Sequence, residues 1–244
     1  MTVRTNHLDQ PIGFPVPGWT GATPPARTPM QGRTVRLEPL DAAAHGGDLF
    51  AAYGADAEGR LWTYLPAGPF NDDRPGFDAW LKGCEASADP LFFTAIDQTN
   101  GTALGVASYL RIEPKVGVIE VGFITFSPAL QRTVMATETM FLMMARVFDA
   151  LGYRRYEWKC DNLNAPSNAA AKRLGFSYEG LFRQATIYKG RNRDTAWYSI
   201  LDTEWPALKT AFETWLDSAN FDAEGRQRIS LSELTRAALV QPGA

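Results

Sequence analysis

The chain of 244 residues has few of the side chains that metal sites and hydrolytic triads need. His7 and His45 are its only histidines, and Cys84 and Cys160 stand alone rather than in a CxxC pair, so no metal-ligand spacing is present. A GxSxG nucleophile motif is missing, as are the glycine-rich GxGxxG and GxxxxGK[ST] loops. These absences argue against a metal centre, a classical hydrolase and a Rossmann or P-loop nucleotide enzyme.

The chain also lacks a marked excess of one charge and any long apolar run. Its 24 basic and 27 acidic residues give a net charge of −3, so neither nucleic acid nor an anionic membrane is expected as a partner. No apolar run approaches the roughly 20 residues of a membrane helix, and the first residues lack the pattern of a secretory leader. Two unpaired cysteines fit a reducing compartment. We therefore expect an unprocessed, soluble protein of the cytoplasm.

Proline and glycine are concentrated in the first 30 residues, in "QPIGFPVPGW" and "TPPARTP". This composition prevents regular helix and favours an extended path. Phe14 and Trp19 indicate an arm that packs on something, although composition alone leaves a flexible tail equally open. The rest of the chain, with a hydrophobic content of 45% overall, predicts one domain over 31–203 and a helical extension over 204–244.

The period of the hydrophobic residues changes along the chain between two, typical of strands, and three to four, typical of helices. Strands are expected at 33–40, 91–97, 102–112, 116–126, 154–160 and 195–201. Helices are expected at 41–65, 76–88, 137–151, 165–174, 204–216 and after Ser232. Turn-prone "QTNG" and "EPK" separate the second, third and fourth strands, which predicts an antiparallel meander. The order of elements indicates a mixed α/β fold.

The segment "SPALQRTVMATE" (127–138) leads from an expected strand into an expected helix. Such a loop aims unpaired backbone N–H groups and the positive end of the helix dipole at one point, which suits a phosphate. No glycine eases the turn here, so the loop by itself favours an ordinary connection. A second motif changes that balance: "NAPSNAAAKRLGF" (164–176) places Ser167 three residues after Asn164 and ends in a Gly-Phe pair.

The two motifs in this order resemble those of the GNAT superfamily of acyl-CoA-dependent N-acetyltransferases. Gln131 and Ala136 match both ends of its [QR]-x-x-G-x-[GA] loop, and Asn164, Ser167 and the pair at 175–176 match its N-x-x-[AS]-x-x-x-Y-x-x-x-G-F helix. Within the superfamily, the chain is similar to the branch of the ribosomal-protein N-terminal acetyltransferases. The resemblance implies a twisted, largely antiparallel sheet flanked by helices, with acetyl-CoA as co-substrate and no metal.

The resemblance also implies roles for individual residues. Glu120 would take a proton from the acceptor ammonium, and Ser167 would protonate the leaving sulfur. Strand alternation places Glu120 on the same side as Gly122, Ile124 and Phe126. Contacts with coenzyme A are implied for Ile124, Phe126, Gln131, Arg132, Thr133, Val134, Met135, Ala136, Thr137 and Asn164.

Each role has a simpler competitor, and two positions depart from the family pattern. Glu120 also fits a surface charge on a strand, Asn164 a plain helix N-cap and Ser167 a solvent-facing serine. Val134 replaces the middle glycine of the loop, so a φ above zero is costly there, and the loop amides still point inward if every residue stays right-handed. Ala171 replaces the tyrosine that serves many relatives as a general acid, so Ser167 inherits that task if an acid is needed.

We therefore expect an N-acetyltransferase that moves an acetyl group from acetyl-CoA to a primary amine of a small molecule, a peptide or a protein N-terminus. The two departures leave a non-catalytic acyl-CoA-binding module as the alternative. Aromatic residues between positions 62 and 80 either line a pocket for the unknown acceptor or form core. Pairing with a second copy of the chain is left open, through the C-terminal strands or the Trp-rich segment 204–216.

Overall fold

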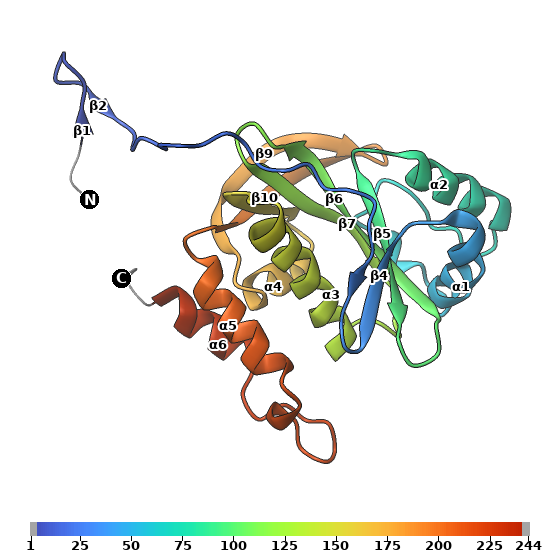
Figure 1. Cartoon of the computed structure of the whole chain (residues 1–244). Helices are drawn as coiled ribbons and strands as arrows, with labels where there is room; N and C mark the ends of the chain where they lie inside the picture. Colours follow the sequence, from blue (N-terminus) through green and yellow to red (C-terminus); the bar gives the residue numbers. More distant parts are fainter. Residues whose placement is uncertain (1–3, 241–244) are drawn as a thin grey trace.

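The computed structural model describes residues 4–240, which form one eight-stranded sheet with helices against both faces (Figure 1). The strand order is β3-β4-β5-β6-β7-β8-β10-β9, and all neighbours are antiparallel except the parallel pair β7 and β8. The expected mixed α/β fold with a largely antiparallel sheet is confirmed. The strands are β3 Met30–Gln31, β4 Val35–Pro39, β5 Leu91–Asp97, β6 Ala103–Glu113, β7 Val118–Phe126, β8 Arg155–Asp161, β9 Ser177–Tyr188 and β10 Arg191–Leu201.

The helices divide between the two faces of the sheet. The helices are α1 Ala42–Gly54, α2 Arg74–Ala86, α3 Val134–Ala145, α4 Ala165–Arg173, α5 Trp205–Leu216 and α6 Leu231–Val240, with single turns η1 Arg60–Trp62, η2 Arg146–Ala150 and η3 Ser218–Asn220. α1 and α2 cover β5 and β6, where Leu49 and Phe77 are fully buried. α3 covers the opposite face, where Met143, Tyr156 and Phe212 are fully buried. Each face thus has its own apolar core, and burying such side chains stabilises the fold by about 1.5–3 kcal/mol per residue.

Strand β7 contains an irregularity that reverses the sides of its later residues. Val121 packs in the core on the α3 side, so Glu120 points to the side of α1 and α2. Phe123 has φ +48°, and the register between β6 and β7 shifts around it. Beyond this bulge, Ile124 and Phe126 pack on the α3 side. The expectation that Glu120 shares a side with Ile124 and Phe126 is wrong, because the bulge adds one residue to the alternation.

Strands β7 and β8 run together only over their first halves. Their parallel pairing ends at Val121 opposite Trp158. Beyond that point β7 continues to Phe126 beside β6, and β8 continues to Asp161 beside β10. We call the unpaired halves the β7–β8 fork. No strand within residues 4–240 fills the fork, so it leaves backbone polar groups in the middle of the sheet without a strand partner.

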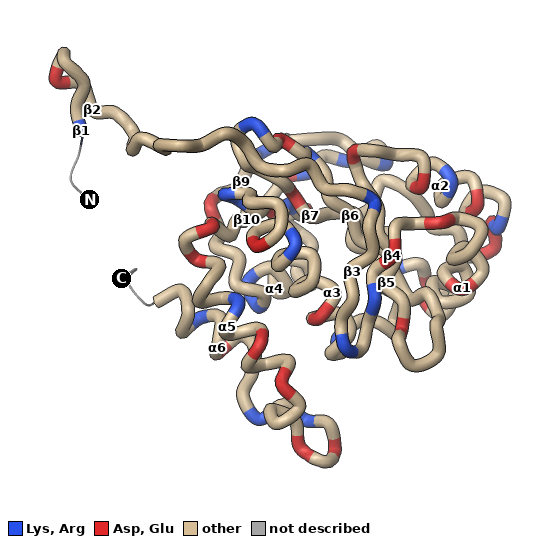
Figure 2. The backbone as a smooth tube through the Cα atoms, viewed as in Figure 1, with Lys and Arg blue, Asp and Glu red and all other residues tan. Residues whose placement is uncertain are grey.

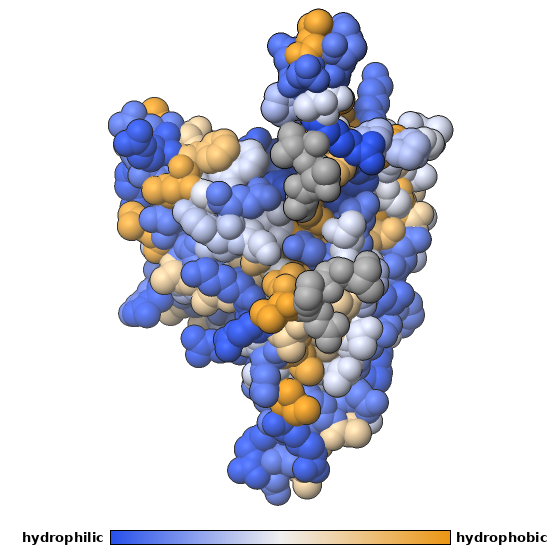
Figure 3. Space-filling view, turned by 90° about the vertical axis from the view of Figure 1, so that its left-hand side faces the viewer, coloured by the Kyte–Doolittle hydropathy of each residue, from blue (hydrophilic) through white to orange (hydrophobic). Residues whose placement is uncertain are grey.

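The N-terminal arm has two parts. Residues 4–16 extend away from the body, and β1 (Arg4–Thr5) and β2 (Pro11–Ile12) pair there as a short hairpin (Figure 1); the arm stands out at the top of Figure 3. From Trp19 onward the arm lies on the body, because the Trp19 indole N–H donates to the carbonyl of Lys115 at 2.8 Å. Trp19 thus packs on the body as expected, whereas Phe14 is exposed and its ring lies against the Arg4 guanidinium within the arm.

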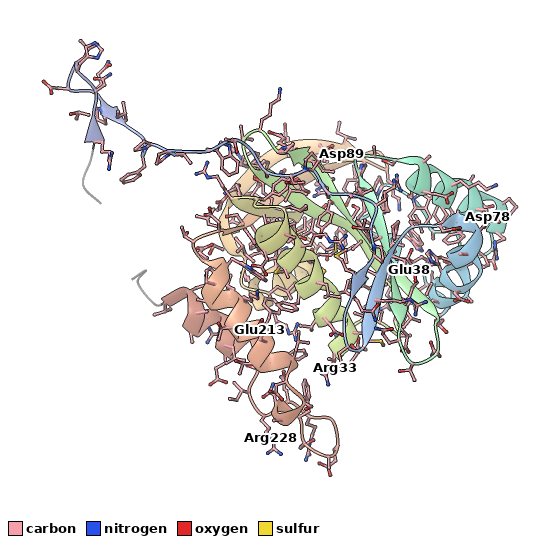
Figure 4. The ribbon with its side chains drawn as sticks, viewed as in Figure 1. Arg33, Glu38, Asp78, Asp89, Glu213 and Arg228 are labelled. Atoms are coloured by element: carbon pink, nitrogen blue, oxygen red, sulfur yellow. The ribbon has the colours of Figure 1, made fainter. Side chains whose placement is uncertain are left out.

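The C-terminal helices cover α3 rather than the sheet itself. Phe212 of α5 stacks on Phe141 of α3 with ring centroids 5.6 Å apart, and α6 packs against α5 and α4. At the far end of α5, the Arg33 guanidinium from the β3–β4 turn donates to the carbonyl of Leu216 at 2.7 Å; Figure 4 labels Arg33. The extension therefore supports the helix whose first turn belongs to the candidate site.

Three expectations about elements need correction. The helix expected at 41–65 ends at Gly54, and the single turn η1 is the only helical part of 55–65. Residues 177–188 form β9, which the sequence did not predict, because this edge strand is exposed on both sides and lacks a period of two. The helix expected from 137 begins at Val134, so the second half of the proposed phosphate loop is helical. Within residues 4–240, no helix has both the length and the apolar character of a membrane span.

Candidate active site

Helices α3 and α4 start at the ends of the two arms of the fork. β7 and β8 are parallel, so their C-terminal ends lie at the same edge of the sheet. The loop at 127–133 leads from β7 into α3, and the turn at 162–164 leads from β8 into α4. The fold therefore brings the two sequence motifs, about 30 residues apart, to the mouth of one opening.

The loop before α3 turns through a left-handed residue and ends in a helix cap. Arg132 has φ +61°, so the loop is not right-handed throughout. The Thr133 hydroxyl accepts a hydrogen bond from the Ala136 N–H at 3.1 Å. The Gln131 side-chain amide donates to the carbonyl of Phe126 at 2.8 Å, which ties the loop back to β7. These bonds fix the loop without any glycine.

Four backbone N–H groups at this point find no acceptor within the described part of the chain. They belong to Arg132, Thr133, Val134 and Met135. Thr137 already donates to the Thr133 carbonyl, at 3.4 Å. Free N–H groups at the start of a helix, together with the helix dipole, attract an anion. Val134 sits in the first helical turn, where its backbone is right-handed, so the missing glycine does not prevent this arrangement.

Glu138 anchors the start of α3 to the turn between β3 and β4. Its buried carboxylate accepts from the backbone N–H groups of Arg33 and Thr34, each at 2.7 Å, and of Val35 at 3.2 Å. A Cβ added at Gly32 would lie 2.8 Å from its carboxyl carbon. Sequence analysis did not single out this residue, although it ends the loop motif, because nothing in the local pattern shows that an acid there is buried.

Asn164 and Ser167 form the first turn of α4. The Asn164 side-chain Oδ1 accepts from the Ser167 N–H at 3.2 Å, as a helix N-cap does. The Trp158 indole N–H donates to the Ser167 hydroxyl oxygen at 3.1 Å. An indole can only donate, so the bond from Trp158 does not use the Ser167 proton. Burial raises the pKa of the neighbouring Cys160 thiol, and a hydrogen bond with Ser167 opposes that rise.

The remaining positions of the second motif are structural in this fold. Ala171, at the place of the family tyrosine, is fully buried. Gly175 has φ +88°, and a Cβ there would lie 2.6 Å from the side chain of Leu208. Phe176 packs on Trp158, with ring centroids 5.6 Å apart. The Gly-Phe pair thus ends α4 and holds it against β8.

Glu120 lies on the α1–α2 side of the sheet within a buried ion-pair cluster. Its Oε2 is 2.8 Å from the Lys159 Nζ and 3.0 Å from the Arg111 Nε. The Lys159 Nζ is also 2.6 Å from the Glu157 Oε2 and 3.8 Å from the centroid of the Trp197 ring. Burial raises the pKa of Glu120, and the charge of Lys159 is the largest opposing effect. A carboxyl pKa moved toward neutrality suits a general base.

Contacts between loops close the α1–α2 side of this region. The Lys189 Nζ, from the β9–β10 turn, donates to the carbonyl of Trp62 at 2.7 Å. The Tyr64 hydroxyl donates to the carbonyl of Leu163, just before α4, at 3.0 Å. Trp62 and Phe77 are buried in the aromatic core, so part of the aromatic set between 62 and 80 is core rather than pocket lining. Residues 4–240 contain no group of three or more His, Cys, Asp or Glu placed to hold a metal ion.

The arrangement offers separate chemistry on the two sides of β7. The α3 side presents free amides and the Ser167 hydroxyl, which suit an anion and a leaving group that needs a proton. The α1–α2 side presents the Glu120 carboxylate, which suits an ammonium group that must lose a proton. The structure thus places the loop residues at the end of β7, places Asn164 and Ser167 at the end of β8, and puts Glu120 on the other side of the sheet.

Three comparisons with known proteins agree with this geometry. A family model described as an acetyltransferase (GNAT) domain matches residues 34–177. A GCN5-related N-acetyltransferase from Brucella melitensis is 48% identical, and its crystal structure matches with a TM-score of 0.88 over 91% of this chain and 100% of that chain. A structure described as a probable acetyltransferase of the GNAT family from Chromobacterium violaceum is 42% identical, with a TM-score of 0.75 over 81% of this chain and 98% of that one.

More distant relatives share the fold. The uncharacterized N-acetyltransferase YnaD of Bacillus subtilis is 27% identical over 160 residues, which cover 65% of this chain and 90% of that protein. A Salmonella typhimurium acetyltransferase, described as modifying the N-terminal serine of a 50S ribosomal subunit protein, is 19% identical with a TM-score of 0.60 over 71% of this chain and 99% of that chain. At that identity the similarity to the ribosomal-protein branch shows the fold alone.

Proposed function

The chain belongs to the GNAT acetyltransferase superfamily, and from that premise we propose that it transfers an acetyl group from acetyl-CoA to a primary amine. One observation carries the proposal: four backbone N–H groups that have no acceptor among residues 4–240 lie at the start of α3, beside the β7–β8 fork. A diphosphate is the kind of group that such amides bind.

The residues of the loop fit the donor substrate. The amides of 132–135 would hold the diphosphate of coenzyme A, and the exposed Arg132 side chain adds a positive charge. The unpaired inner edge of β7 near Ile124 and Phe126 offers hydrogen bonds to the pantetheine amides, as an added strand would. The Asn164 side-chain N–H₂ group is left for the same chain, because only its oxygen is used as the cap.

Two side chains then move protons. Glu120 takes a proton from the acceptor ammonium, which leaves a neutral amine with a free electron pair. The amine nitrogen forms a bond to the acetyl carbon, the carbon–sulfur bond breaks, and the nitrogen loses its second proton to solvent. Ser167 gives its hydroxyl proton to the leaving thiolate and recovers one from solvent. The products are an acetamide and the free thiol of coenzyme A.

Calorimetric titration with acetyl-CoA tests the donor site. Val134→Glu places a negative charge in the first turn of α3, and Val116→Glu makes the same change at an exposed turn between β6 and β7. A charge about 5 Å from the diphosphate repels it by roughly 1–3 kcal/mol, so we expect about 5- to 100-fold weaker binding for Val134→Glu. Val116→Glu should bind like the wild type, and circular dichroism checks that each variant is folded.

The outcomes separate the two candidate functions. Binding that is lost only in Val134→Glu, with release of free thiol when amines are added, supports the acetyltransferase. Binding without thiol release from any amine supports the non-catalytic acyl-CoA-binding module. No binding by the folded wild type would reject both and make 127–138 an ordinary connection.

A further inference from the structure

The β9–β10 hairpin carries, in its turn and at the start of β10, three cations that form no ion pair with a carboxylate of the described chain. Lys189, Arg191 and Arg193 occur within five residues of a chain whose net charge is −3. Among residues 4–240, no carboxylate oxygen lies within the 4.0 Å that defines an ion pair with any of the three. The next acid, Asp194, accepts instead from the Gln184 N–H at 2.7 Å and from Asn192 at 2.9 Å.

This turn is fixed beside the candidate site rather than free in solvent. The Tyr188 hydroxyl donates to the carboxylate of Asp161, at the end of β8, at 2.8 Å. The Lys189 Nζ reaches the carbonyl of Trp62, on the loop between α1 and α2. Arg193 is close enough to Cys160, beside Ser167, for its charge to oppose the rise in the Cys160 pKa that burial causes. In Figure 1 the β9–β10 hairpin crosses behind the sheet toward α2, and Figure 2 marks the charged positions on the same view.

Without a bound anion, the electrostatic energy of the Lys189, Arg191 and Arg193 side chains is unfavourable. Like charges repel, and partial burial together with the charge of Arg191 lowers the pKa of Lys189. The Arg191 guanidinium lies 5.8 Å from the centroid of the Tyr188 ring, and the Arg193 Nε donates to the Thr195 hydroxyl at 3.1 Å. Their contacts are therefore with neutral groups, which leaves the positive charge available to a bound molecule.

We infer that the acceptor is an amine that also carries a carboxylate, which Lys189, Arg191 and Arg193 recognise at the mouth of the site. The inference rests on the proposed acetyl transfer and adds the chemical class of its acceptor. Its geometry is an ammonium at Glu120 and a carboxylate at the β9–β10 turn, so the two charges of one acceptor meet side chains of opposite sign. A free amino acid and an acidic peptide both have this chemistry.

The test compares acceptors that differ only in charge. Alanine and alaninamide form one pair, and two C-terminally amidated, alanine-initiated pentapeptides with following glutamates or glutamines form the other. The full-length wild type is compared with Lys189→Gln/Arg191→Gln and with a control, Lys82→Gln/Lys115→Gln, which removes two exposed charges elsewhere. Thiol release gives kcat/KM for each acceptor, and acetyl-CoA titration checks the donor site.

We expect the wild type to prefer the acidic member of at least one pair, and the pair that shows the preference identifies the source of the carboxylate. Removing two partly exposed charges should reduce that preference about 3- to 30-fold, while the control keeps it. A wild type that transfers acetyl equally to both members, or a preference unchanged in the hairpin variant, overturns the inference and leaves acetyl transfer intact. Binding of acetyl-CoA without transfer to any amine overturns both.

Discussion

The lysine at the centre of the ion-pair cluster permits a sharp test of the site's electrostatics. Lys159→Met keeps a similar chain length and removes the charge that lies 2.8 Å from Glu120 and 2.6 Å from Glu157. The Lys159 and Glu120 side chains are 4% and 6% exposed, so water cannot replace the lost partner. Arg111 and Arg155 still face the two carboxylates after the change.

Both the size and the pH dependence of the effect follow. Removing one partner of a buried ion pair costs roughly 3–5 kcal/mol of folding free energy. Because two arginines remain, we expect a loss of about 3 kcal/mol. For a chain of this length that corresponds to a drop of about 6–12 °C in Tm. Without Lys159 the pKa of Glu120 rises further. A carboxyl group whose pKa is raised by folding stabilises the folded state in acid, and this stabilisation is lost as the pH rises through the folded-state pKa. The deficit is therefore smallest in acid and grows toward neutral pH.

Urea unfolding between pH 5 and pH 8 measures this deficit. The set is the wild type, Lys159→Met, Glu120→Gln and the double variant, with Lys159→Arg as a control that keeps the charge. In the double variant the neutral amide no longer needs a cation, so its stability at pH 8 should exceed that of Lys159→Met. A deficit below about 1 kcal/mol, or one that stays constant over this pH range, would refute a buried, Lys159-compensated Glu120.

Further predictions concern activity, anchoring and assembly. Glu120→Gln should abolish the acid limb of the pH-rate profile while acetyl-CoA still binds in calorimetry; an unchanged limb excludes it as the base. Ser167→Ala should lower kcat by roughly 100-fold or more without changing acetyl-CoA affinity, and an unaltered kcat excludes it as the acid. Glu138→Gln should destabilise the fold by about 1.5–3 kcal/mol in urea unfolding, because its bonds to the 33–35 backbone lose their charge. We also propose pairing of two copies along the exposed edge strand β9; light scattering at the mass of one chain would contradict it.

Local patterns predicted much of this fold because local rules governed those segments. Asp41 caps α1 through a local rule, since its carboxylate accepts from the N–H groups of Ala43 and Ala44, each at 2.9 Å. Asn164 likewise caps α4. The alternation of β4 and the helical face of α5 were visible because one side of each element is buried against a single apolar core.

Features set by distant contacts could not be predicted from one sequence. Most residues of β9 are exposed and none is fully buried, so they show no alternation, and only the pairing with β10 makes this segment a strand. The ion pair between Glu120 and Lys159 joins β7 to β8, about 40 residues later in the chain. Neither residue type indicates from the sequence that the two side chains meet. The bulge at Phe123 carries no glycine to mark it, because a non-glycine residue occupies the left-handed conformation there. The sides of Ile124 and Phe126 were misassigned for that reason.

The same bulge gives the candidate site its two-sided layout. On an unbroken strand, Glu120 and Ile124 would project to one face, and the base would lie on the donor's side of the sheet. With the extra residue, Glu120 stays with the loops of α1 and α2, while Ile124 and Phe126 turn toward α3 and its free amides. A donor held on the α3 side and an amine entering from the α1–α2 side can then meet only through the β7–β8 fork, where no strand intervenes in the described chain. A phenylalanine in the left-handed conformation inside a strand costs about 1–3 kcal/mol. Separation of the two proposed substrates gives a functional reason for that cost.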